Sequence, residues 1–312
     1  MERIKYFIFI LVFLLSIFLI KFLMPYLRNA GIVQFERDEG PDSHKIKEGT
    51  PRGGGIIFFL APLFLLFFYK NSEFLFLYLA LILNGFVGFI DDFLTATKRH
   101  STGLTIKWKM ILITVIALFL YIFGRNFLTY ELSIGNSSFQ IGSFFYFILF
   151  LIIFVGSPNA FNLTDGIDGL LGIVSIPMLV TIAIINKGIV RDFSFILIPS
   201  IIAFLWFNSP KASIFMGDTG AGALGGAIAA MSILGKFELL LPLIAIIPVL
   251  ESLSVFIQVG YFKLSKGKRV FKMAPIHHHF ELSNWSESEI DFRFFIITVM
   301  FCILALFFRG RM

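Results

Sequence analysis

The feature that most constrains this sequence is a succession of ten apolar segments that together occupy most of its length. They cover residues 4–27, 53–70, 74–91, 106–124, 143–160, 168–186, 193–208, 218–235, 239–261 and 290–308. Only 15% of the residues are charged, whereas a soluble domain carries about 25%. A water-facing surface of ordinary size cannot be built from such a sequence, so lipid must be the solvent for most of it.

The segments are continuous apolar runs, which indicates membrane-spanning helices rather than the alternating strands of a β-barrel. Several are shorter than the roughly 20 residues that cross a bilayer, so we expect their ends to lie in the interface. The first exceeds the roughly 7–15 apolar residues of a signal peptide and is predicted to be a retained span. Without an internal repeat or a low-complexity linker, the sequence predicts one domain over residues 1–312. We expect an all-α polytopic membrane protein with about ten transmembrane helices.

The loops between the segments form two sets that differ in basic content. One set holds sixteen Lys and Arg residues and the alternate set holds five. By the positive-inside rule, the first set is predicted to be cytoplasmic and both termini to lie outside. These loops account for the formal net charge of +6, and no nucleic-acid binding is expected. In the outer loop at 125–142, alternating residues around Gly135-Asn136 predict a short outer-face β-hairpin.

Five aspartates stand where apolar segments end, all on the side assigned to the cytoplasm. They are Asp91, Asp92, Asp165, Asp168 and Asp218. Ionisable groups at membrane depth are costly and usually functional, and clustered carboxylates repel one another unless a cation holds them. Asp91 and Asp92 alone could cap a helix end in water, but the stretch around Asp165 is too polar for that role. Oxygen ligands without cysteine favour Mg²⁺ or Mn²⁺ over zinc.

Basic and glycine-rich motifs accompany these carboxylates. Lys47 and Arg52 precede three glycines, whose backbone N–H groups at a helix start can hold a phosphate, although this is not a Walker A loop. The run His277–His279 lacks spaced co-ligands for zinc, so phosphate or sugar contacts are favoured. Glu251, inside the ninth segment, is expected to make a polar helix–helix contact. Together the motifs indicate phosphoryl transfer between a soluble donor and a lipid acceptor.

These motifs resemble those of the polyprenyl-phosphate N-acetylhexosamine-1-phosphate transferases, and in particular the phospho-N-acetylmuramoyl-pentapeptide transferase family (translocase I). The superfamily motifs are Asp91-Asp92, Asn162-Leu-Thr-Asp165-Gly-Ile-Asp168-Gly and Phe215-Met-Gly-Asp218. The family-specific ones are Gly49-Thr-Pro51 and the long stretch 260–282 around the histidines. The resemblance implies ten transmembrane helices, a cytoplasmic-face active site in the bacterial inner membrane, Mg²⁺ as cofactor and a homodimer. It also implies transfer from UDP-MurNAc-pentapeptide to undecaprenyl phosphate, which yields lipid I and UMP.

The resemblance assigns roles residue by residue. Asp218 matches the magnesium ligand, and Asp92 matches the residue that we expect to be the base or nucleophile. The other catalytic positions are Asp91, Asp165 and His277. Substrate-binding positions are Lys47, Lys109, Asn159, Asn162, Asp168, Asn208, Phe215, His278 and His279. In these roles Phe215 stacks on uracil and Lys47 faces the diphosphate.

The sequence departs from the family pattern at a few positions. Arg52 and Gly53 stand where threonine and methionine are usual, Thr95 replaces a lysine, and Ala221 replaces a serine.

Several alternative functions and mechanisms stay open. A related enzyme transfers N-acetylglucosamine-1-phosphate to the same lipid, and a two-step reaction through an aspartyl-phosphate competes with direct transfer. An ion-coupled transporter is disfavoured because its charges would lie near the membrane midplane, whereas these lie at one face.

Overall fold

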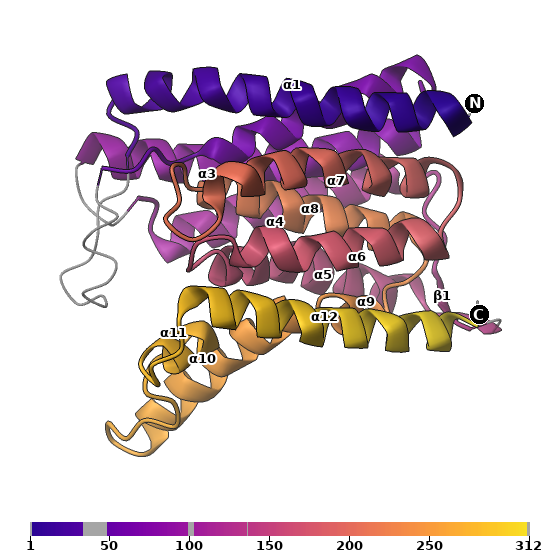
Figure 1. Cartoon of the computed structure of the whole chain (residues 1–312). Coiled ribbons are helices and arrows are strands. Elements are labelled where there is room, and N and C mark those ends of the chain that lie inside the picture. The colour runs from indigo at the N-terminus through magenta and orange to yellow at the C-terminus, as the bar shows by residue number, and fades with distance from the viewer. Residues whose placement is uncertain (1, 34–48, 99–102, 136, 311–312) are drawn as a thin grey trace.

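The computed structural model describes residues 2–33, 49–98, 103–135 and 137–310. Helices dominate these residues, and two short strands form a hairpin (Figure 1). The elements are α1 (Glu2–Asn29), η1 (Gly54–Phe59), η2 (Ala61–Phe67), α3 (Ser72–Lys98), α4 (Ile106–Gly124), β1 (Glu131–Ile134), β2 (Ser137–Gln140), α5 (Ser143–Thr164), α6 (Leu170–Ile185), α7 (Gly188–Asn208), α8 (Gly217–Gly235), α9 (Leu241–Ile244), α10 (Ile246–Leu264), α11 (Ile276–Glu281) and α12 (Glu287–Arg309).

Each of the ten predicted segments contains helical structure, which confirms the predicted all-α membrane fold. Among the described residues, seven helices are long and apolar enough to cross a membrane: α1, α3, α4, α5, α7, α10 and α12. The predicted hairpin is also confirmed, because β1 and β2 pair antiparallel from Glu131 with Gln140 to Ile134 with Ser137. In Figure 1, α1 begins and α12 ends at the end of the bundle where the hairpin lies. Which face is cytoplasmic stays a prediction.

Two segments depart from the single α-helix that we expected. Segment 53–70 forms the 3₁₀ helices η1 and η2. At about 2.0 Å per residue, Gly54–Phe67 extends about 28 Å, close to the thickness of a bilayer core, where an α-helix of this length would be too short. Segment 239–261 breaks at Ala245 into α9 and α10. Pro248 contributes to the break, because its ring would clash with the Ile244 carbonyl in a continuous α-helix.

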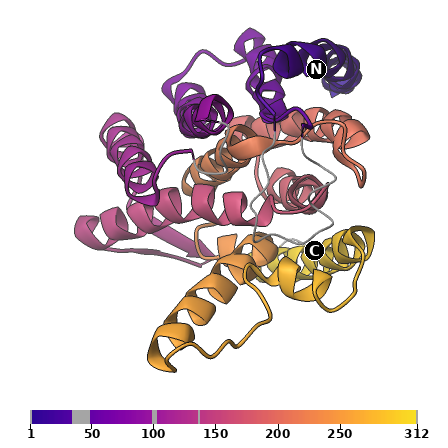
Figure 2. The same cartoon turned by 90° about the vertical axis from the view of Figure 1, so that its left-hand side faces the viewer.

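Helix α8 forms the centre of the bundle. Nearly all of its residues are buried, and it packs most extensively against α3 and α5. Small residues allow this close approach: a Cβ at Gly226 would lie 2.5 Å from the Ala80 carbonyl oxygen, and one at Gly225 would lie 2.6 Å from the Pro158 Cα. Figure 2 views the bundle from one end, with α10 projecting away from the other helices. The central packing fixes where the N-terminus of α8 lies relative to α3 and α5.

Candidate active site

Four of the predicted carboxylates come from three helix ends at the same end of the bundle. Asp91 and Asp92 lie near the C-terminus of α3, Asp165 is the C-cap of α5, and Asp218 lies in the first turn of α8. A fifth residue, Arg52, joins them from the segment that precedes η1. The predicted grouping of the motifs at one face is therefore what the fold produces.

Asp92 connects α3 to the N-terminus of α8. Its Oδ1 accepts a hydrogen bond from the Asp218 N–H (3.1 Å), and its Oδ2 accepts from the Thr219 N–H (3.0 Å) and the Thr219 hydroxyl (2.6 Å). Arg52 Nε donates to Oδ1 at 2.6 Å. The first N–H groups of a helix have no partner within it, so Asp92 caps α8 from a neighbouring helix. With 1% of its side chain exposed and four donors on two oxygens, this carboxylate is fully engaged.

Asp218 is held by two cations. Arg52 Nη2 contacts its Oδ1 at 2.7 Å, and Lys109 Nζ from α4 contacts its Oδ2. Lys109 also donates to the Asn162 side-chain oxygen on α5 at 3.3 Å. The predicted residues Lys109, Asn162 and Asp218 thus lie together, and they connect α4, α5 and α8 at the site.

The two remaining carboxylates are less engaged. The Oδ1 of Asp91 accepts from the Leu104 N–H at 2.8 Å. Burial raises the pKa of Asp165 well above its usual range, with the negative charges of Asp218, Asp92 and Asp168 adding to the effect and Arg52 opposing it. Among the described residues of the cluster, Asp91, Asp92, Asp165 and Asp218 face the cations of Arg52 and Lys109. If all four carboxylates were ionised, two negative charges would be left over, which equals the charge of one divalent cation.

The three predicted histidines have different polar partners. His277 is fully buried, and its Nδ1 lies 3.1 Å from Glu251 Oε1 on α10. The His277 ring packs on the turn after Asp165, because a Cβ at Gly166 would lie 2.1 Å from its Nε2. His278 Nδ1 pairs instead with Glu281 at 2.6 Å, and His279 Nδ1 accepts from the Lys272 N–H at 3.1 Å. The expected polar contact of Glu251 is thus made with His277, next to the carboxylate cluster.

Several predicted substrate-binding residues are engaged with the protein itself. Asp168 Oδ2 accepts from the backbone N–H groups of residues 211 and 212. Asn208 accepts from the Gly169 N–H and donates to the Ile214 carbonyl. The Asn159 amide donates to the carbonyl of Val155 on its own helix. The contacts of Asp168 and Asn208 hold the loop after α7 against the turn between α5 and α6. Direct substrate contact by all three residues stays a prediction.

Phe215 and Lys47 are predicted site residues, and Arg52 is a site residue that the sequence analysis does not assign. Phe215 is half-buried, and its backbone pairs with the segment that carries Arg52: its N–H donates to the Pro51 carbonyl at 2.8 Å, and the Gly54 N–H donates to its carbonyl at 2.9 Å. Lys47 lies outside the described residues. Arg52, a departure from the family pattern that is not among the predicted site residues, contacts both Asp92 and Asp218. Its place directly before the three glycines is the sequence feature that could have indicated this role.

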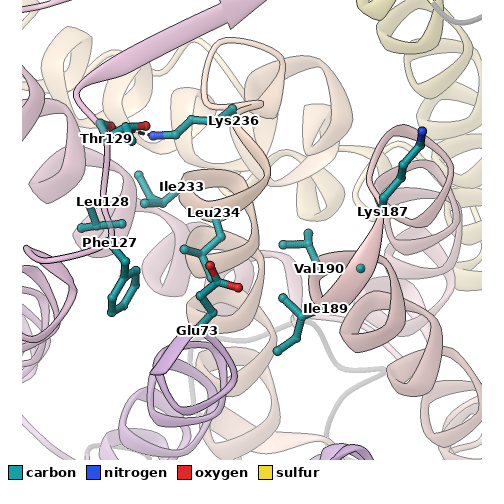
Figure 3. A pocket seen from close by; sticks show the side chains of 11 residues that line it. Glu73, Phe127, Leu128, Thr129, Lys187, Ile189, Val190, Ile233, Leu234 and Lys236 are labelled. Carbon is teal, nitrogen blue, oxygen red and sulfur yellow. Dashed lines mark hydrogen bonds between the residues drawn. The ribbon is translucent and has the colours of Figure 1, made fainter. Parts of the chain in front are cut away.

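A pocket lies at the other end of α8, about 26 Å from Asp218 at 1.5 Å per residue. It measures about 350 Å³ and is lined by residues that include Glu73, Lys187 and Lys236 (Figure 3). Lys236 Nζ donates to the Thr129 carbonyl at 2.7 Å. None of the predicted site residues lines this pocket, so the carboxylate cluster is the candidate for the chemistry.

Comparisons with known proteins identify a family and several relatives that are similar to this chain. A family model described as glycosyl transferase family 4 matches residues 74–236. A phospho-N-acetylmuramoyl-pentapeptide-transferase of Dictyoglomus thermophilum is 44% identical over 294 residues, which are 93% of this chain and 94% of that protein. Proteins of the same name from Halalkalibacterium halodurans and Thermotoga maritima are each 41% identical, over 98% and 94% of this chain and 98% and 96% of their own lengths. These relatives therefore match almost the whole chain, including the stretch around the histidines.

Proposed function

The chain belongs to the family of phospho-N-acetylmuramoyl-pentapeptide transferases, and on this premise we propose that it transfers phospho-N-acetylmuramoyl-pentapeptide from UDP-MurNAc-pentapeptide to undecaprenyl phosphate. The products are lipid I and UMP, in the synthesis of peptidoglycan. The observation that carries the proposal is the cluster in which Asp91, Asp92, Asp165 and Asp218 meet Arg52 and Lys109 at one end of the helix bundle. A site at a membrane face can receive a water-soluble nucleotide sugar and a lipid phosphate together.

In the proposed reaction, an oxygen of the lipid phosphate attacks the phosphorus that bears the sugar, and the bond from that phosphorus to the UMP oxygen breaks. A carboxylate takes the proton of the lipid phosphate. Asp92 is the base that the resemblance implies, but we assign this step to Asp91 instead, because both oxygens of Asp92 already accept hydrogen bonds. Asp91 accepts one from the Leu104 N–H through Oδ1, which leaves it better able to accept a proton. The same saturation disfavours Asp92 as a nucleophile in a two-step route.

We propose Mg²⁺ as the cofactor, with Asp218 as its ligand. The cluster offers carboxylate oxygens, which suit Mg²⁺, and with all four carboxylates ionised its two surplus negative charges would match one divalent ion. Within the part of the chain that the structure describes, no three acidic, histidine or cysteine side chains are grouped closely enough to hold a metal, and Arg52 and Lys109 contact the Asp218 oxygens. The donor type fits the ion, and the charge fits it when all four carboxylates are ionised. When bound, Mg²⁺ neutralises charge on the diphosphate.

We further propose that the carboxylate end of the bundle faces the cytoplasm in the bacterial inner membrane, with both termini outside. The charge distribution of the loops supports this orientation. The resemblance to the family supports a homodimer. Labelling of single cysteines in intact cells tests the orientation, and crosslinking in membranes tests the dimer.

The test of the function is UMP release by purified protein in detergent with undecaprenyl phosphate and Mg²⁺. UDP-MurNAc-pentapeptide is compared with UDP-N-acetylglucosamine as donor. Release with the first donor alone, abolished by EDTA and by Asp218→Asn, is the expected result. Glu73→Gln, which neutralises an exposed carboxylate at the other end of α3, is the matched control and should retain activity. Release with the second donor alone would replace the proposed substrate, and no release with either would reject the activity.

A further inference from the structure

Arg52 is the side chain that joins the two carboxylates at the junction of α3 and α8. Its Nε contacts Asp92 Oδ1 at 2.6 Å and its Nη2 contacts Asp218 Oδ1 at 2.7 Å. Burial alone would lower the pKa of Arg52, but the neighbouring Asp92 and Asp218 outweigh this effect and raise it. The guanidinium is therefore a permanent positive charge between two carboxylates.

The backbone around Arg52 holds this guanidinium in place. The Arg52 N–H donates to the Ile32 carbonyl at 3.1 Å, and the neighbouring Pro51 forms a bridge with Val33. On the other side, the Phe215 N–H donates to the Pro51 carbonyl at 2.8 Å. Gly53 adopts a left-handed conformation (φ 89°) that leads directly into η1. Arg52 therefore lies in a segment that is paired on both sides. The position of its guanidinium is preorganised by this pairing.

We propose that Arg52 is a resident counter-ion that holds Asp92 and Asp218 together without metal and competes with the divalent cation for Asp218. Like charges buried together repel strongly, and Arg52 supplies the opposing charge from within the chain. A cation that binds Asp218 needs an oxygen that Arg52 or Lys109 now contacts. Arg52 also contacts Asp92, so it can release the Asp218 oxygen and stay paired. This inference rests on the proposed role of Asp218 as metal ligand.

The test measures binding of Mn²⁺, a probe that favours the same oxygen ligands, to purified protein in detergent by electron paramagnetic resonance of the free ion. Arg52→Gln removes the competing charge and should bind Mn²⁺ about tenfold more tightly than the unmodified protein, since a unit charge a few ångströms away is worth a factor of this order or more. Arg28→Gln makes the same change at an exposed position in the last turn of α1 and should leave the affinity unchanged. Asp218→Asn should abolish binding in both backgrounds.

Thermal unfolding provides the second measurement. In EDTA, Arg52→Gln should unfold several degrees below the unmodified protein, and Mn²⁺ should reduce the difference, because the metal then supplies the missing charge. Arg52→Lys retains the charge but not the two-pronged contact, so its Tm in EDTA should also fall. It provides the test if Arg52→Gln cannot be purified folded. An Arg52→Lys Tm in EDTA equal to that of the unmodified protein would contradict the inference.

The outcomes separate this inference from the proposed function. Equal or weaker Mn²⁺ binding by Arg52→Gln would overturn the competition, even if the unmodified protein binds Mn²⁺ through Asp218 and releases UMP. Absence of binding in both proteins would overturn the metal assignment together with the inference. If Arg52→Gln bound Mn²⁺ more tightly but the unmodified protein released no UMP, the inference would be sustained and the proposed reaction rejected.

Discussion

Gly88 lies where α3 crosses the start of α8, and replacing it with alanine tests how strictly the site depends on that crossing. A Cβ at Gly88 would lie 2.0 Å from the Asp218 carbonyl oxygen and 2.1 Å from its carbonyl carbon. Ordinary contacts begin at 3.4 Å, so the two backbones must separate by the difference, about 1.4 Å. Asp92 lies one turn further along α3 on the same face. Its 3.1 Å and 3.0 Å hydrogen bonds to the N–H groups of Asp218 and Thr219 cannot survive that displacement.

We expect Gly88→Ala to lower the rate of UMP release by about 10²-fold or more, since a displacement of about 1 Å at a catalytic group has this effect. Overpacking of a tight contact costs about 1–3 kcal/mol, so the Tm should fall as well. The matched control is Gly156→Ala on α5, where an added Cβ meets nothing within 4 Å. That variant should retain activity and be slightly stabilised, by about 0.5–1 kcal/mol, because alanine favours a helix.

The assay is UMP release per folded protein, with Tm measured on the same preparations by intrinsic fluorescence. Activity of Gly88→Ala within threefold of the control, together with an unchanged Tm, would refute the reasoning, because the α3–α8 contact would then be free to relax without disturbing Asp92. Loss of activity in both variants would also refute it, since the effect would not be specific to the crossing.

Three further predictions address individual side chains. Asp91→Asn should lose roughly 10²–10⁴-fold in turnover and keep a Tm close to that of the unmodified protein. Asp92→Asn should lower the Tm as well, because it weakens the connection between α3 and α8. Equal Tm values for the two variants would contradict this division of roles. Asp165 has a raised pKa, so folding favours its protonated form and the stability of the protein falls as pH rises above the unfolded-state pKa of this group. Asp165→Asn should therefore raise the Tm at pH 8 by about 2 °C or more, while activity is lost. An unchanged or lower Tm would contradict the raised pKa. Glu251→Gln should reduce kcat by a larger factor than it changes KM, because it releases the buried His277 ring. Glu251→Asp should recover part of the lost kcat. An unchanged kcat would exclude this positioning role.

Much of the fold and the grouping of the site could be predicted from the sequence. Apolar runs locate the helices directly, because few residues other than apolar ones are tolerated in lipid. Once the spans are counted, alternation along the chain requires the end of α3 and the start of α8 to lie at the same face. Asp92 and Asp218 were therefore expected near one another, although 126 positions separate them in the sequence.

The partners of the individual side chains could not be predicted. Periodicity and charge counts indicate which residues share a face, but not which of several cations reaches a given carboxylate. Arg52 lies 166 positions from Asp218, and only the packing of α8 brings the two together. The pairing of Glu251 with His277 likewise depends on the break at Ala245, which redirects α10. The sequence shows that Pro248 disturbs a helix, but not in which direction the chain continues.

The paired aspartates illustrate how one motif can serve structure and chemistry at once. Consecutive residues of an α-helix point about 100° apart, so Asp91 and Asp92 cannot present their carboxylates in the same direction. Asp92 points into the bundle, where its hydrogen bonds cap α8 and fix the position of Asp218. Asp91 points toward the residues before α4, where its Oδ1 meets the Leu104 N–H. A site that needs one carboxylate to hold a helix end and another to accept a proton can therefore obtain both from adjacent positions. For this reason, substitutions at the two positions should differ in their effect on stability more than in their effect on activity.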